Sequence, residues 1–197
     1  MCGSISSSNM DNVAQTCKSL SDDGIWSEEP MFQVQHQQGG LVSVRDELLI
    51  IGGRTTAVEV LDNSAWSFYE ANITAVLNSF TTIVHNDQPY LFGGYGFFEQ
   101  DYSDRIWTYS YEEQKWQVVG FMAIPRMNFR SIKSKLLNRK NQLTLSVDNV
   151  VYSAGGLGDD MKIERFDFES MISNALTIGI SNVLYPEIVP VGYYNCE

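Results

Sequence analysis

The feature that most constrains this chain is a repeated pairing of tryptophan with a glycine doublet. Three apolar runs end in two glycines, at residues 48–53, 89–94 and 150–156. Trp26, Trp66 and Trp116 precede these doublets by 26, 27 and 39 positions, so the third interval contains an insertion. Self-similarity at a period of about 20–50 residues is the sequence signature of a repeat architecture.

Each unit is expected to contain four strands. The first three are an alternating run, the apolar run before the doublet, and a third run after it. The first and second are separated by a short polar turn, at Arg45-Asp46, Asn86-Asp87-Gln88-Pro89 and Asp148-Asn149. The first strands are predicted at 41–46, 79–84 and 143–147, and the third strands at 57–61, 105–111 and 162–168. A fourth strand begins at Trp66 and at Trp116. This pattern predicts an all-β fold.

Residues 93–120 combine a glycine doublet, an aromatic third strand, a polar turn and a tryptophan. This stretch resembles the kelch repeat, and residues 26–53 and 66–94 resemble the linking half of the same motif. The resemblance covers about residues 17–170. It implies a β-propeller of kelch-type four-stranded blades, incomplete or short at three to four blades. The implied organisation is a tail over 1–16, repeats over 17–181 (units of about 26–66, 66–116 and 116–181) and a tail over 182–197.

Two departures from the kelch pattern stand out. Kelch repeats usually carry a basic residue about ten positions after the tryptophan, and Arg126 matches this position after Trp116. His36 and Val76 occupy the corresponding positions of the other units. The third unit also lacks a tryptophan in its fourth strand, where residues 174–181 are expected to pair.

Three interpretations of ring closure remain open, since propellers close with about four to eight blades. The chain is a fragment or truncated product of a longer protein, or a four-bladed ring in which the strand at Trp26 completes the last blade. The third interpretation is self-association of the chain to complete a ring.

Charge and hydropathy exclude some partners. The net charge is −11, from 24 acidic and 13 basic residues, which disfavours nucleic acid and anionic membranes. No apolar run is long enough to span a membrane, and no signal peptide is visible at the N-terminus. The localisation is therefore left open: cytoplasmic if the chain is complete, extracellular if it belongs to a longer secreted protein.

The cysteines also allow two interpretations. The preferred one is that Cys2, Cys17 and Cys196 are free thiols in a reducing compartment, and the alternative is a Cys17–Cys196 disulfide that ties the termini together. The sequon Asn72-Ile73-Thr74 agrees with secretion, although such triplets are frequent.

The sequence offers few groups for catalysis. His36 and His85 are isolated and are interpreted as structural or surface histidines. No nucleophile, phosphate-binding or metal-binding motif is present. Copper oxidases on kelch propellers need a tyrosine cross-linked to an interior cysteine, and the interior of this chain has none. We therefore expect no catalytic residue, cofactor or metal, and a non-catalytic scaffold. The alternative is a cofactor-independent carbohydrate-active enzyme or sugar-binding module on the same scaffold.

Two segments are candidates for binding a protein partner. One is a basic cluster that coincides with the insertion and is interpreted as an exposed loop: Arg126, Arg130, Lys133, Lys135, Arg139 and Lys140. The other is an aromatic loop with Tyr95, Phe97, Phe98 and Tyr102. Loops of repeat folds often carry recognition, and exposed aromatic residues are typical anchors of interfaces.

Overall fold

The protein is described from a computed structural model that covers residues 17–127, 130–133, 149–154 and 163–176. Every regular element within these ranges is a β-strand. No helix among them is long and apolar enough to cross a membrane. The chain is therefore all-β over the residues that the structure describes, as the sequence predicts.

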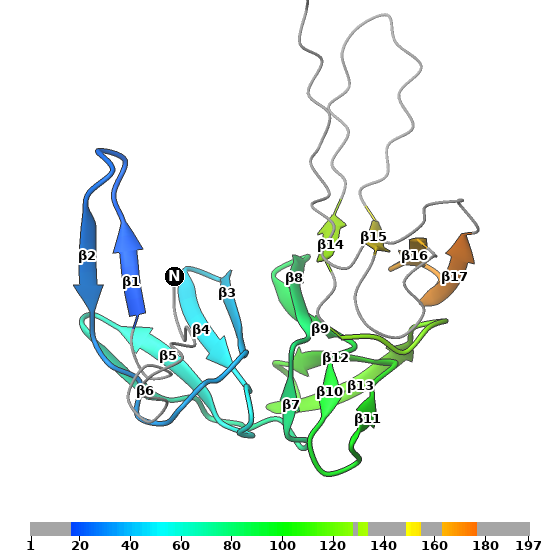
Figure 1. Ribbon diagram of the computed structural model, residues 1–197, viewed down its shortest axis with the longest axis horizontal. Coiled ribbons are helices and arrows are strands. Elements are labelled where there is room, and N and C mark those ends of the chain that lie inside the picture. Colours follow the sequence, from blue (N-terminus) through cyan, green and yellow to red (C-terminus); the bar gives the residue numbers. More distant parts are fainter. Residues whose placement is uncertain (1–16, 128–129, 134–148, 155–162, 177–197) are drawn as a thin grey trace, which may run out of the picture.

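Three four-stranded antiparallel sheets contain most of these strands (Figure 1). The first sheet consists of β3 (Gly40–Val44), β4 (Glu47–Ile51), β5 (Val58–Asp62) and β6 (Ala65–Phe68), in that order. The second consists of β8 (Thr81–His85), β9 (Gln88–Phe92), β12 (Arg105–Ser110) and β13 (Lys115–Phe121). The third consists of β14 (Arg130–Lys133), β15 (Val150–Ala154), β16 (Ile163–Asp167) and β17 (Ile172–Leu176).

Two smaller sheets accompany them. The N-terminal hairpin pairs β1 (Cys17–Leu20) with β2 (Trp26–Glu29). The small sheet joins β7 (Leu77–Asn78), β10 (Tyr95–Gly96) and β11 (Asp101–Tyr102), with β10 in the middle. The second sheet lies between the first and the third, and the hairpin lies at the far side of the first sheet (Figure 1).

The predicted polar turns close the first hairpin of two sheets. Arg45 and Asp46 have φ of 51° and 64°, and Asn86 and Asp87 have φ of 49° and 54°. Two consecutive residues with positive φ form the tight turn whose twist matches that of the flanking strands. A short polar turn is therefore confirmed at both positions, although the second is shorter than the predicted 86–89, because Gln88 and Pro89 already belong to β9.

The glycine doublets are required by backbone conformation and by crowding. Gly52, Gly53, Gly93 and Gly94 all have positive φ. A Cβ on Gly53 would lie 2.6 Å from the backbone nitrogen of Gly39, and one on Gly94 would lie 2.8 Å from the carbonyl oxygen of Asn78. Any other residue would therefore strain the backbone at both positions.

The sheets pack face to face through apolar side chains, with their first strands together. Strand β8 lies against both β3 and β14. Trp107, Tyr109 and Trp116 of the second sheet are buried against Val42, Leu49 and other residues of the first sheet. On its other face the second sheet packs Tyr90 and Phe92 against Phe166 and Phe168 of the third. His85 stacks on Phe168 with ring centroids 3.9 Å apart.

The third sheet differs from the expected strand order in two ways. Its first strand was expected at 143–147, which lies outside the described residues, and β14 at Arg130–Lys133 takes that place instead. The insertion follows β14, where the other sheets have a two-residue turn. The fourth strand is β17, so the idea that the Trp26 strand completes the last sheet is wrong: β2 pairs with β1.

Two further expectations concern the N-terminal half of the chain. Cys17 is disulfide-bonded, which overturns the preferred interpretation of a free thiol at this position. Cys2 and Cys196 lie outside the described residues. Asn72, the asparagine of the sequon, is exposed.

Candidate functional site

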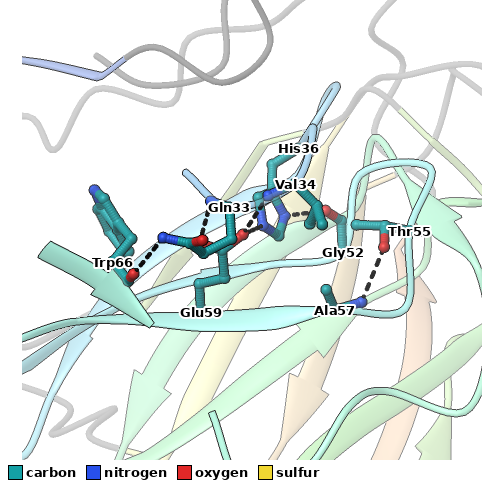
Figure 2. Close-up of polar contacts among 8 residues, drawn as sticks. All are labelled: Gln33, Val34, His36, Gly52, Thr55, Ala57, Glu59 and Trp66. Carbon is teal, nitrogen blue, oxygen red and sulfur yellow. Dashed lines mark hydrogen bonds and ion pairs between the residues drawn. The ribbon is translucent and has the colours of Figure 1, made fainter. Parts of the chain in front are cut away.

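A buried carboxylate ties the segment before the first sheet to the third strand of that sheet (Figure 2). Glu59 of β5 is fully buried and accepts hydrogen bonds from the backbone N–H groups of Gln33 and Val34, at 2.8 and 2.9 Å. Nε2 of His36 lies 3.0 Å from Oε1 of Glu59, and Nδ1 lies 2.6 Å from the carbonyl oxygen of Gly52. The interpretation of His36 as a structural residue agrees with this network.

The third sheet contains the same arrangement with different residues. Glu164 of β16 occupies the position of Glu59, because each pairs with the residue two positions before its glycine doublet. Glu164 accepts hydrogen bonds from the backbone N–H of Ala123 and from the Ser173 hydroxyl, and Nη2 of Arg126 lies 3.7 Å away. The Glu164 and Arg126 side chains are 2% and 1% exposed, so both lie in the interior.

The second sheet replaces this ion pair with apolar residues. Trp107, which pairs with Leu91, stands at the position of Glu59 and Glu164, and Val76 stands at that of His36 and Arg126. Where Val76 replaces the basic residue of the repeat, the glutamate that would face it is therefore also replaced, by Trp107. Buried pairs of this kind connect the leading segment of a sheet to its third strand and leave no surface for a ligand.

The most exposed aromatic group of the described chain lies in the loop between β9 and β12. Phe98 is 77% exposed, Phe97 46% and Tyr102 36%, whereas Tyr95 is half-buried. The Phe97 and Phe98 rings meet edge to face at 5.9 Å, and Tyr95 and Tyr102 at 6.3 Å. We call residues 95–104 the aromatic loop.

The backbone of the aromatic loop is held at several points. Strand β10 pairs with β7 on one side and with β11 on the other. The Phe97 N–H donates to the carbonyl of Val76 at 3.0 Å, and the Ser103 N–H donates to that of Gly94 at 2.8 Å. Phe98 is therefore presented to solvent from a hydrogen-bonded base.

A shallow pocket of about 180 Å³ opens at the base of the aromatic loop. Its walls are Leu77, Gly96, Glu99, Asp101, Tyr102, Ser103, Asp104 and Arg105. Arg105 lies 3.8 Å from Glu99, which leaves an excess of negative charge among the lining side chains. Within the described ranges, no three His, Cys, Asp or Glu residues are placed to hold a metal ion.

One residue of the predicted basic cluster is buried rather than exposed. Arg126 is 0% exposed and faces Glu164, so its assignment to an exposed binding loop is wrong. The backbones of Arg130 and Lys133 lie in β14 rather than in a loop, which corrects their placement too. Lys135, Arg139 and Lys140 lie outside the described residues and remain a prediction.

Sequence reasoning did not single out the acidic side of the aromatic loop. Glu99, Asp101 and Asp104 lie within six positions of the sequence, and all three line the pocket. The signal in the sequence is the combination of acidic and aromatic residues in one short segment.

Comparison with known proteins gives a fold likeness and no family. No protein-family model matches the chain, and no curated protein does. The solved structure of YjhT is similar, with a TM-score of 0.67 at 12% sequence identity. The match covers 86% of this chain and 60% of the YjhT chain, so this chain spans about three fifths of that structure. At this identity the likeness concerns the fold alone.

Proposed function

We propose that this chain is a kelch-type β-propeller scaffold, without catalytic activity, that binds a protein partner through the aromatic loop. The repeat of glycine doublet, third strand and tryptophan supports the kelch assignment. The contacts of the first strands β3, β8 and β14 support sheets arranged as blades around an axis. Function is inferred from the site and not from the fold, since one fold hosts many functions.

The exposure of Phe98 carries the proposal. A phenylalanine that is 77% exposed beside a second at 46% presents apolar area that water solvates poorly. The hydrogen-bonded base of the loop means that little conformational entropy is lost when a partner covers these rings. Phenylalanine, like tyrosine and tryptophan, is enriched in interfaces relative to the rest of the protein surface.

The charge around the loop defines the partner further. Glu99, Asp101 and Asp104 line the pocket at the base of the aromatic loop together with Tyr102, and the whole chain carries a net charge of −11. Complementary charge accelerates encounter and selects against wrong partners. The proposed partner is therefore a basic protein segment with an apolar residue that packs on Phe98.

The experiment is a selection from a displayed peptide library, followed by affinity measurement on the purified chain. Selected peptides are expected to be rich in Lys and Arg, and Phe98→Ser is expected to weaken their binding at least tenfold. Phe68→Ser is the matched control, because Phe68 lies on β6 of the first sheet, outside the loop, and is 58% exposed. Peptides that bind Phe98→Ser as tightly as the unchanged chain contradict the proposal.

The pocket supports a second candidate, a sugar-binding or carbohydrate-active site. Carboxylates and an arginine beside a tyrosine ring are groups that hydrogen-bond hydroxyls and stack on a sugar face. A saccharide panel tests this candidate by thermal shift and by proton-exchange NMR for turnover. A shift that Asp104→Asn abolishes supports it, and the absence of any shift or turnover across the panel removes it.

A further inference from the structure

The tryptophans of the outer strands face the preceding sheet in two places. Trp66 of β6 is 2% exposed and packs with Cys17 of the hairpin and with Phe32, whose ring lies 4.6 Å away. Trp116 of β13 is 3% exposed against the first sheet, and its indole N–H donates to the carbonyl of Ala71 at 3.2 Å. In both cases the outer face of the neighbouring element covers the indole ring.

Trp26 stands at the same position in the hairpin. It pairs with Leu20 as Trp66 pairs with Leu61, so β1 and β2 correspond to the third and fourth strands of a sheet. Cys17 faces the first sheet, and alternation along the strands places Lys18, Glu28 and Trp26 on the opposite face. Trp26 is 54% exposed there, and no described strand covers it. We call this surface the hairpin face.

The third sheet has the complementary surface. Glu164 and Phe166 point to the second sheet, so Ile163 and Arg165 lie on the other face, together with Tyr152 opposite Arg165. We call this surface the end face. The matching positions of the first sheet, Leu49, Val58 and Val60, pack against the second sheet. On the end face the corresponding side chains are only half-buried, with no described strand lying over them.

We propose that the hairpin face of one copy of this chain docks on the end face of a second copy. The repeat supports this contact, because Trp66 and Trp116 are each covered by the outer face of a neighbouring element. The end face is an outer face of the same kind, and it is open to a tryptophan from another copy. The chain does not bring its own two surfaces together: the hairpin lies beside the first sheet and the third sheet beyond the second (Figure 1). Each copy therefore carries both halves of a head-to-tail contact.

The two surfaces also match in their charged groups. On the hairpin face Lys18 lies 3.5 Å from Glu28, and on the end face Arg165 lies 2.8 Å from Asp167. Each surface thus offers one cation and one anion at the rim of an apolar contact. In the proposed contact, docking exchanges the exposed Lys18–Glu28 pair and the half-buried Arg165–Asp167 pair for pairs between copies.

Tryptophan fluorescence makes the contact directly measurable. The chain has four tryptophans, and the other three, Trp66, Trp107 and Trp116, are at most 5% exposed. Quenching by acrylamide therefore reports almost only on Trp26. As the concentration of the full chain rises, we expect the mass from light scattering to double or increase further, and the quenchable fraction to fall with it.

Variants locate the interface. Trp26→Glu and Ile163→Glu are each expected to hold the chain monomeric at concentrations where the unchanged chain associates. Phe121→Glu is the matched control, because it charges an equally exposed aromatic position away from both surfaces and is expected to associate normally. Circular dichroism and the melting temperature show whether each variant is folded.

Three outcomes overturn the proposal: a chain that stays monomeric throughout, an oligomer in which Trp26 remains fully quenchable, and association that survives both Glu substitutions. The Phe98→Ser chain is expected to associate like the unchanged chain. The mass of this variant in solution therefore tests the contact between copies independently of the partner site at the aromatic loop.

Discussion

At the scale of single residues, the chain uses the same positions for different chemistry. The position ten residues after the tryptophan holds His36, Val76 and Arg126, and the facing position of the third strand holds Glu59, Trp107 and Glu164. Polar residues face polar residues and apolar residues face apolar ones. This matching follows from the cost of burying a charge without a partner.

Replacing Gly94 by alanine is expected to destabilise the chain more than the same change at Gly24. Both residues have positive φ, at 101° and 78°, so both variants lose about 1 kcal/mol or more to backbone strain. Only at Gly94 would the new Cβ also meet backbone atoms, whereas nothing lies within 4 Å at Gly24. Urea unfolding of both variants measures the difference. Equal losses show that close approach does not matter at the doublet.

Removing the His36 side chain is expected to cost about 2–3 kcal/mol, because the buried Glu59 carboxylate loses one hydrogen-bond partner while two backbone N–H groups still bind it. Lys115→Ala is the control, since it breaks the exposed Lys115–Glu113 pair and is expected to cost less than about 1 kcal/mol. Denaturant midpoints of the two variants give the comparison. A His36→Ala chain as stable as Lys115→Ala contradicts a supporting role for the network.

The role of a residue was predictable from the sequence where it depends on the local backbone conformation. It was not predictable where it depends on a partner that is distant in the sequence. The doublets and the turn at Asn86-Asp87 were predictable because glycine, asparagine and aspartate tolerate positive φ. Arg126 was assigned both to the repeat pattern and to a basic loop, and only the position of Glu164 decides between them. A cluster of charges in sequence says nothing about which member is buried.

At the scale of strands and sheets, tyrosines contribute to the contact between the first and second sheets. Tyr69 meets Tyr109 at 5.4 Å, and Tyr109 meets Tyr111 at 5.0 Å. Burial raises the pKa of all three above the ordinary tyrosine value, and for Tyr69 the charge of Glu47 raises it further. The contact therefore requires the neutral phenols.

Stability is expected to fall at alkaline pH because of this cluster. Unfolded tyrosine ionises at a pKa of about 10, and the folded groups ionise at higher pH. The contribution of the cluster is therefore fully present below that pH and is lost as the pH rises beyond it. The free energy of unfolding is measured at pH values from 8 to 11, in steps of about half a unit around the unfolded tyrosine pKa. It is expected to decline less steeply with pH in Tyr69→Phe than in the unchanged chain. Identical pH profiles argue against the cluster.

The order of the strands was predictable from the sequence where the turns are short. The prediction was wrong in the third unit, where the chain has its insertion. In the third unit the first strand was placed next to the second, as in the other two units. The structure instead pairs β15 with β14, on the far side of the insertion. The interval from Trp116 to Arg130 equals that from Trp26 to Gly40, a spacing that identifies the first strand from the tryptophan side.

At the scale of the whole molecule, the sheets of the described residues follow one another from the hairpin to the third sheet (Figure 1). Sequence repeats predict each sheet, because every unit carries its own turns and apolar faces. They do not predict what covers the two outer surfaces, since that depends on what lies beyond the repeats. The exposed Trp26 and the aromatic loop are thus separate features of one scaffold, one at an end and one within the small sheet.

The most direct test of the account is the footprint of a selected basic peptide, mapped by hydrogen–deuterium exchange on the full chain. The account predicts slower exchange over residues 95–105, which contain the aromatic loop and its acidic side chains, and unchanged exchange over the first sheet and the N-terminal hairpin. Protection confined to any segment other than 95–105, with the aromatic loop exchanging as in the free chain, contradicts it.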